Sequence, residues 1–235
     1  MEKMTGRERI GNILQRKPVD RIGLFEHFWG DTQREWVKRG WVREDDQFVD
    51  LFDFDLDLCW PFNLMADLDF APQVVEETEE TILQRDGNGA LLRRHKLHDS
   101  TPEHVDFLVK ERDAWEEHIK PLLKPDRRRI NFDHYRQMKR LCQEKQRFFM
   151  WSGVNVFELM HPVCGHEHLL YGMAMDPEWV IDMVDTYSGL TVELQEILFA
   201  EEGKPDGVFY YEDMGFKGHP FMSPAMYNEI IKPGH

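Results

Sequence analysis

Apolar positions along the chain alternate between short strand-like runs and longer stretches at helical spacing. Thr5 and Glu8 have the spacing of a capping box before an apolar helical face, so we expect a first helix over residues 6–15. Strands are expected at residues 21–25, 56–60, 148–153 and 207–212. Further helices are expected at residues 32–38, 115–123, 131–145, 156–160, 168–173, 177–198 and 224–231.

Residues 73–97 follow a different pattern. Two strand-like segments flank the turn sequence DGNG at 86–89, which supplies residues that accept the positive φ angles of a tight hairpin. The pattern predicts an antiparallel hairpin inserted between the helical segments.

Strands that alternate with helices favour a parallel sheet with crossover helices, and a closed sheet of this kind is a (β/α)8 TIM-barrel. About four strand–helix units can be counted, whereas a barrel needs eight. We therefore expect an α/β fold in which residues 1–235 form a single barrel-type domain that holds about the N-terminal half, plus the hairpin. The other half of the barrel would be encoded further along the chain or would come from a second chain. A homo-oligomer is a further alternative.

The composition of the chain excludes some classes of binding partner. With 235 residues, of which 41% are hydrophobic, the chain can bury a sizeable core, and its formal net charge of -15 repels nucleic acid and anionic membrane surfaces. Neither a secretory leader nor a membrane-spanning run is evident. The three cysteines, Cys59, Cys142 and Cys164, form no close pair, so we expect reduced thiols and a cytoplasmic protein.

Two adjacent carboxylates end the strand expected at 207–212. In parallel α/β folds the carboxyl ends of strands converge on the face where sites form. Glu212 and Asp213 are therefore candidates to bind a cation or N–H groups, or to transfer a proton. The alternative is that one acid caps a helix and the other is solvated.

Other polar and aromatic side chains follow the remaining expected strands. Glu26 and His27 adjoin Trp29 after the first strand, and a histidine beside an acid can act as acid or base, although an ordinary loop histidine fits equally well. The candidates after the second, third and fourth strands are Trp60, Asn155, His161 and Lys217.

The segment HPVCGHEH, residues 161–168, contains three imidazoles and a thiol, all of which zinc accepts as ligands. Pro162 and Gly165 interrupt it, which makes simultaneous coordination by these neighbours sterically awkward. We therefore expect an ordinary strand-to-helix connection with one functional histidine and no metal ligand.

Three segments resemble the uroporphyrinogen decarboxylase superfamily. The opening MTGRERIGNILQRKPVDRIGL is similar to its N-terminal helix and Pro-x-Asp-Arg turn, here Pro18, Asp20 and Arg21. FFMWSGVNVFELMHPVCGHEHLLYGMAMDPEWV looks like its third strand with the helices that follow, and DGVFYYEDMGFKGHPFMSPAMYNEIIKP like its fourth strand, acidic turn and Ser-Pro helix. The resemblance implies a (β/α)8 barrel and one of two activities.

The first implied activity is decarboxylation of uroporphyrinogen without a cofactor. The family's decarboxylases hold substrate carboxylates with an arginine-containing segment after strand one, where this chain has FEHFWG at 25–30 with no arginine. A substrate with eight carboxylates would meet Glu26 in a chain of charge -15. His161 and Glu212-Asp213 also depart from the Tyr and Asp-Ser of decarboxylases, and Trp60 stands near the place of the turn that holds the pyrrole N–H groups.

The second implied activity is methyl transfer between a corrinoid protein and a thiol, or O-demethylation. It uses zinc, held by His-x-Cys and a later Cys on strands beyond the fourth. We expect this branch, with uroporphyrinogen decarboxylase and a non-catalytic half-barrel subunit as alternatives. Catalytic roles are expected for Asp213, Glu212 and His161, and substrate-binding roles for Glu26, His27, Trp29, Trp60, Asn155 and Lys217.

Overall fold

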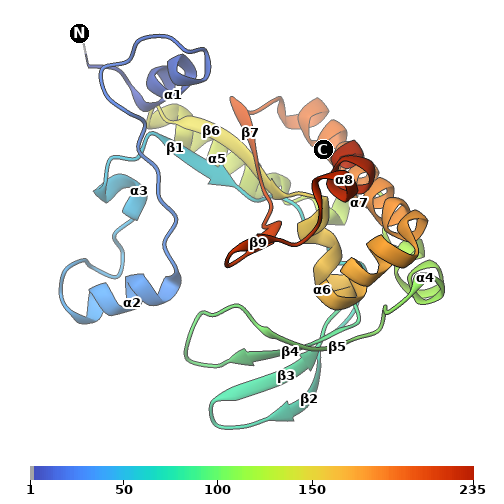
Figure 1. The fold of residues 1–235 in the computed structure, drawn as a ribbon. Helices are drawn as coiled ribbons and strands as arrows, with labels where there is room; N and C mark the ends of the chain where they lie inside the picture. The colour runs from blue at the N-terminus through green and yellow to red at the C-terminus, as the bar shows by residue number, and fades with distance from the viewer. Residues whose placement is uncertain (1–2) are drawn as a thin grey trace. The chain divides into compact units, whose positions relative to one another are not determined.

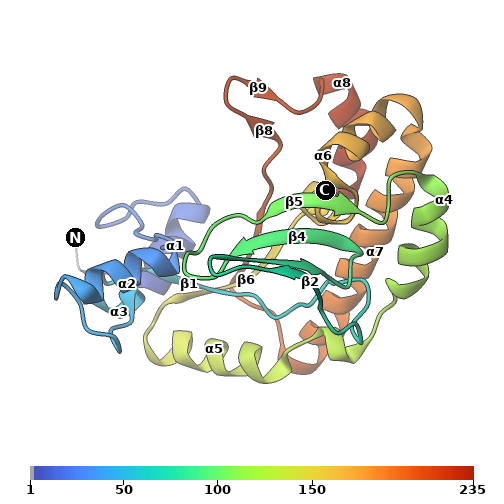
Figure 2. The ribbon, with the colours of Figure 1, turned by 90° about the horizontal axis from the view of Figure 1, so that it is seen from below.

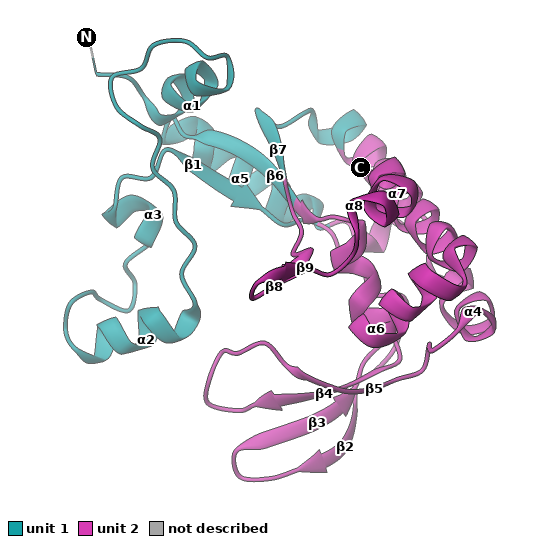
Figure 3. Ribbon diagram, in the orientation of Figure 1, with its two compact units in different colours: residues 1–61, 131–152, 199–209 teal, residues 62–130, 153–198, 210–235 magenta. Residues whose placement is uncertain are grey.

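The computed structural model describes residues 3–235, which group into two compact units (Figures 1 and 3). Of the described residues, the first unit comprises 3–61, 131–152 and 199–209, and the second comprises 62–130, 153–198 and 210–235. Each unit is described in turn.

The first unit holds α1 (Gly6–Leu14), α2 (Gly30–Lys38), α3 (Phe48–Leu51), β1 (Leu56–Cys59) and α5 (Phe132–Glu144). Three elements run from one unit into the other: β6 (Phe148–Val154), α7 (Pro177–Glu202) and β7 (Gly207–Tyr211). The second unit holds β2 (Gln73–Glu77), β3 (Thr81–Arg85), β4 (Ala90–His95), β5 (Glu103–Phe107), α4 (Arg112–Ala114), η1 (Trp115–Ile119), η2 (Lys120–Leu122), η3 (Arg127–Arg129), α6 (Val156–Met175), β8 (Gly215–Phe216), β9 (His219–Pro220), α8 (Pro224–Met226), η4 (Tyr227–Ile231) and η5 (Lys232–Gly234).

The N-terminal helix forms as its sequence predicts. Thr5 and Glu8 cap α1 reciprocally, each side chain accepting from the other residue's backbone amide. The prediction of a strand at 21–25 is wrong, because no strand forms there. The Leu24 amide donates to the Asp55 carboxylate at 2.8 Å, so a side chain takes the donor that a strand ladder would need.

The parallel sheet has the order β1-β6-β7. The Asp206 amide donates to the Phe149 carbonyl at the start of β6 and β7, and the Asn155 amide donates to the Tyr211 carbonyl at their ends, so these two strands run in the same direction. The parallel register of β1 and β6 pairs Leu56 with Phe148, Asp57 with Phe149, Leu58 with Met150 and Cys59 with Trp151.

Apolar side chains on the sheet form the core of the first unit. Phe148 and Met150 of β6 are buried with Ile10 of α1. Tyr135 of α5 packs on Phe149 with ring centroids 5.0 Å apart, and its hydroxyl donates to a backbone carbonyl at 2.9 Å. The sheet is therefore covered by the helices that the sequence predicts next to it.

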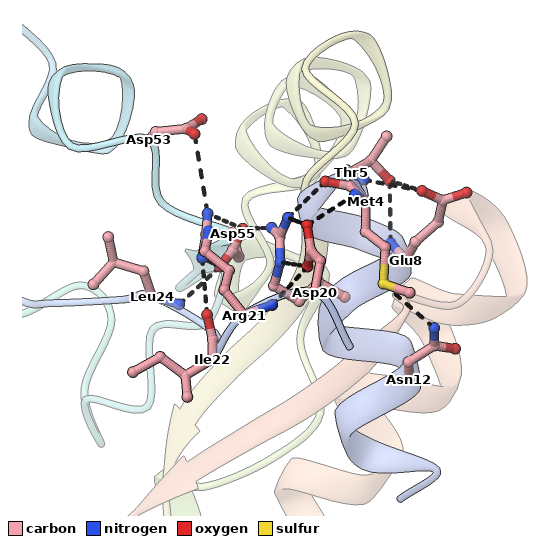
Figure 4. Close-up of polar contacts among 11 residues, drawn as sticks. Met4, Thr5, Glu8, Asn12, Asp20, Arg21, Ile22, Leu24, Asp53 and Asp55 are labelled. Carbon is pink, nitrogen blue, oxygen red and sulfur yellow. Dashed lines mark hydrogen bonds and ion pairs between the residues drawn. The ribbon is translucent and has the colours of Figure 1, made fainter. Parts of the chain in front are cut away.

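A buried arginine ties α1 to the turn at residues 18–21 and to the start of β1 (Figure 4). The Arg9 guanidinium, 2% exposed, contacts both Asp20 and Asp55, and Nη2 also donates to the Met4 carbonyl at 2.6 Å. Arg21 donates to Asp55 from the other side at 2.6 Å. The Asp20-Arg21 pair of the Pro-x-Asp-Arg turn thus has a structural use: it supplies counter-charges within a buried network.

The second unit is built on a four-stranded antiparallel sheet of order β2-β3-β4-β5, with β5 at one edge (Figure 2). The DGNG turn joins β3 and β4: the Asp86 carboxylate accepts from the amides of Asn88 and Ala90, and Gly89 has φ +76°. The expected hairpin is thus present, with one further strand on each side of it.

Helices α6 and α7 pack in the same unit. The sequence predicts two helices over 156–173 separated by a connection. The structure has two helical segments within Val156–Met175, and they meet at the non-helical Gly165 (φ 73°, ψ 158°). Helix α7 begins as predicted, with the Asp176 carboxylate accepting from the Trp179 amide before Pro177. Trp115 of η1 is buried and donates to Asp182 of α7 at 2.8 Å.

Arg129 of η3 is a second buried guanidinium, and it has a different kind of partner. It donates to five backbone carbonyls, which belong to Asn63, Met65, Ala66, Leu122 and Lys124. The side chain therefore fastens two irregular segments of the second unit to each other without a carboxylate.

The observed architecture is mixed α/β with a parallel sheet. None of the helices within residues 3–235 combines the length and the hydropathy of a bilayer-crossing segment.

The buried network around Arg9 yields a stability prediction. Arg9→Met should lower the free energy of unfolding by about 3 kcal/mol, because the carboxylate of Asp55 stays buried after losing one of its cations. Urea denaturation followed by circular dichroism measures the change. The matched control is Arg43→Met, whose guanidinium is on the surface of the same unit. Equal midpoints for the two variants would show that the buried pair contributes nothing.

Candidate functional site

The ends of β6 and β7 meet at the start of α6. The side chain of Asn155 accepts from the Val156 amide at 2.9 Å, and the Glu212 carboxylate accepts from the Phe157 amide. Two residues predicted to act on a substrate therefore make helix-capping contacts here. A carboxylate at the positive end of a helix dipole is a stabilising arrangement.

Glu212 is buried, with its side chain 6% exposed. Its other carboxylate oxygen, Oε2, lies 2.6 Å from Nε2 of His235. Burial raises the pKa of Glu212, while His235 and the Phe157 amide oppose the rise. The group is thus a buried carboxylate with a histidine neighbour, a pair between which a proton can be shared.

Asp213 and Lys217 lie further along the same segment, and both are exposed. Lys217 is in the turn between β8 and β9, next to Gly218 with φ +97°. Burial, together with the charges of Glu158 and Asp213, raises the pKa of Tyr211. The carboxyl ends of β6 and β7 are therefore surrounded by acidic groups.

His161 lies on α6, one turn after Glu158, and its Nε2 contacts the Glu158 carboxylate. The ring of His166 stacks on that of His161, with centroids 4.3 Å apart and planes inclined by 21°. His104 of β5 approaches from the antiparallel sheet, at 6.0 Å between ring centroids. The sequence indicated His161 alone, and the structure places it with two other imidazoles.

Two histidines of this group, His104 and His166, were not predicted as site residues, and the sequence pointed to only one of them. His166 belongs to the HPVCGHEH segment, which the sequence marked and then assigned to a connection. The break between two helices is present, but it is confined to Gly165, so His161 and His166 both lie in α6. His104 is an isolated histidine in a strand, with no pattern in the sequence that points to it.

The remaining predicted residues belong to the first unit. The Glu26 carboxylate accepts from the backbone amide of His27 at 2.8 Å, a local contact in an extended segment. Trp29 immediately precedes α2 and is exposed, and Trp60 follows β1 and is also exposed. Their substrate-binding roles stay predictions.

A cavity of about 420 Å³ lies in the first unit, between the start of α1 and the segments that lead into β1 and β6. The charged side chains that line the cavity form ion pairs with one another: Asp50 contacts both Lys145 and Arg147, and Arg9 contacts Asp55. The cavity is at the amino ends of the parallel strands, the face that serves stability in α/β barrels. It is not a candidate for the site.

The close approach of α6 to β5 leads to a prediction about Gly165. A Cβ atom at this position would lie 2.5 Å from the Phe107 ring, and the positive φ is unfavourable for any other residue. Gly165→Ala should lower the free energy of unfolding by about 1–3 kcal/mol, measured by thermal or urea denaturation. Gly189→Ala is the control in α7, where a Cβ has open space, and it should raise stability by about 0.5–1 kcal/mol. Similar effects of the two substitutions would contradict the packing at the kink.

All three cysteines are buried, and burial raises the pKa of each thiol to about 12. Thiolates are the reactive form, so none of the three should react rapidly with Ellman's reagent at pH 8. All three should react after unfolding in guanidinium. A fast-reacting thiol in the native protein would place at least one of Cys59, Cys142 and Cys164 outside the core.

No family model matches the chain, and no curated protein or solved structure matches it either. We therefore derive the chemistry of the site from its own side chains.

Proposed function

We propose that the protein is an enzyme of the uroporphyrinogen decarboxylase superfamily and belongs to the branch that transfers methyl groups. In this proposal β1, β6 and β7 are strands of a (β/α)8 barrel that further polypeptide completes. The parallel direction of these strands and the helices that connect them support it. The substrate would bind at the carboxyl ends of β6 and β7.

The observation that carries the choice of branch is the charge at those strand ends. Glu212 and Asp213 follow β7 there, and Glu158 lies in the first turn of α6, where the Phe157 amide donates to Glu212. A substrate with many carboxylates would be repelled, whereas a neutral thiol or O-methyl compound would not. Acidic groups at this place favour methyl transfer over decarboxylation of a porphyrinogen.

The proposed reaction moves a methyl group from the cobalt of a corrinoid protein to the sulfur of a thiol. The cobalt–carbon bond breaks, cobalt retains its electron pair, a sulfur–carbon bond forms, and the thiol proton is released. Glu212, whose carboxylate is buried beside His235, is the group proposed to accept that proton. His161 and Asp213 would line the same pocket.

The zinc that the resemblance implies would be held by residues beyond the fourth strand, in the polypeptide that completes the proposed barrel. Its ligands are a His-x-Cys pair and a later Cys, and in this sequence no cysteine stands two residues after a histidine. The three cysteines are buried in the core. We therefore derive no step through that zinc.

Methyl transfer can be tested with methylcobalamin and a neutral thiol such as 2-mercaptoethanol. The purified protein should accelerate loss of the methylcobalamin absorbance and form the methyl thioether, which mass spectrometry identifies. Glu212→Gln should lower the rate at least about 100-fold, because general acid–base catalysis contributes that much. The matched control, Glu229→Gln, changes an exposed residue of the same unit and should retain the rate.

Two outcomes would contradict the proposal. Release of carbon dioxide from uroporphyrinogen, without methyl transfer, would identify a decarboxylase. Absence of both activities, together with a stable complex of two different chains in size-exclusion chromatography, would identify a non-catalytic subunit.

A further inference from the structure

Three histidines from two elements of the second unit converge on one point. One ring nitrogen from each of His104, His161 and His166 lies within 4.8 Å of the other two. All three side chains are half-buried. Imidazoles brought together from separate parts of a chain are a common ligand set for transition-metal ions.

The kink in α6 makes this convergence happen. His161 and His166 are five residues apart, a spacing that points side chains in different directions on a regular helix. The non-helical backbone of Gly165 lies between them, and their rings stack. The same glycine packs on Phe107 of β5, three residues after His104, so one close contact also brings in the third imidazole.

Glu158 occupies one of the two ring nitrogens of His161. Its carboxylate contacts Nε2, which therefore carries the proton that it donates. Nδ1 is left as the nitrogen with a free lone pair, and this atom is buried without a hydrogen-bond partner among the described residues. A buried polar atom without a partner is costly, and a metal ion is one way to satisfy it. Carboxylate–histidine pairs of this kind orient metal ligands.

The surroundings favour neutral imidazoles. Burial, with help from His161, lowers the pKa of His166 to about 4, and burial also lowers the pKa of His104. Phenylalanine rings enclose the cluster: Phe221 lies 4.8 Å from His166, and Phe157 lies 6.0 Å from His161, between ring centroids. The Cys164 thiol is not part of the group, since its Sγ lies 3.5 Å from the Met160 carbonyl oxygen.

We propose that His104, His161 and His166 bind a divalent transition-metal ion such as Zn²⁺, with Glu158 as the positioning residue of His161. Nitrogens bound to zinc at about 2.0–2.1 Å in a tetrahedron lie about 3.3 Å apart, so the three side chains, whose nitrogens lie within 4.8 Å of one another, must move closer together to coordinate the ion. Three protein ligands leave a fourth position open for water or a substrate oxygen. The site shares His161 with the pocket proposed for methyl transfer, but its test measures metal binding, so the two proposals can fail separately.

The experiment is a zinc titration of the purified, tag-free protein after removal of metal with a chelator. Calorimetry, or competition with a chromogenic zinc chelator, should show about one tight site per chain. His104→Gln and His166→Gln should each weaken it by at least about 10-fold, and Glu158→Gln should weaken it by about 10–100-fold. His168→Gln is the matched control on α6, outside the cluster, and should bind zinc as the unchanged protein does.

A second readout needs no variant. Cobalt(II) added to the unchanged protein should give visible absorption bands of a tetrahedral site, without the near-ultraviolet band of thiolate coordination. Circular dichroism of each variant shows whether it is folded. The proposal is overturned if the unchanged protein binds no zinc tightly, or if folded His104→Gln and His166→Gln variants retain its affinity. It is also overturned if only His95→Gln/His98→Gln, which removes a second histidine pair, abolishes binding.

Discussion

Charges that folding removes from water must find partners, and this constraint organises both units of the protein. In the first unit Arg9 joins α1 to the residue before β1 through Asp55. In the second unit Arg129 joins two irregular segments through backbone carbonyls. Since an unpaired buried charge is strongly unfavourable, these contacts restrict how the surrounding segments can be placed. The helices and strands are thus fixed at their ends as well as by their apolar faces.

The same constraint gives Glu212 its position. A carboxylate that is largely withdrawn from solvent needs hydrogen-bond donors, and the first amide groups of α6 supply them. This contact connects the end of β7 to the start of the helix that carries Glu158 and His161. Glu212, a candidate base from the sequence, therefore also links β7 to α6.

Local chemistry in the sequence predicted much of the fold. The capping box of α1, the turn at Asp86–Gly89 and the Asp176-Pro177 start of α7 all form, because each depends on neighbours in the chain. The strand at 21–25 does not form, because the side chain of Asp55, distant in sequence, takes its backbone donor. Local propensity is a weak guide wherever a distant polar group competes.

The candidate site was predictable only in part, for the same reason. Glu212, Asn155 and His161 follow strands, and their place in the chain was enough to single them out. The sequence also allowed the alternative that one of the two acids caps a helix, and Glu212 makes a contact of that kind. His104 could not be found, because nothing local distinguishes a histidine that meets two others from one that meets solvent.

The sequence by itself determined the mixed α/β class, the acidic character of the chain and the bounds of α1, β1, α5, β6 and β7 to within one residue, since these follow from periodicity, capping and composition. Only the tertiary structure decided what the break in HPVCGHEH does. Read locally, Gly165 separates His161 from His166. In three dimensions its positive φ turns α6 so that the two rings stack, and its missing Cβ admits Phe107 of β5. Convergence of side chains depends on packing between distant segments, and packing is not encoded in the spacing of neighbours.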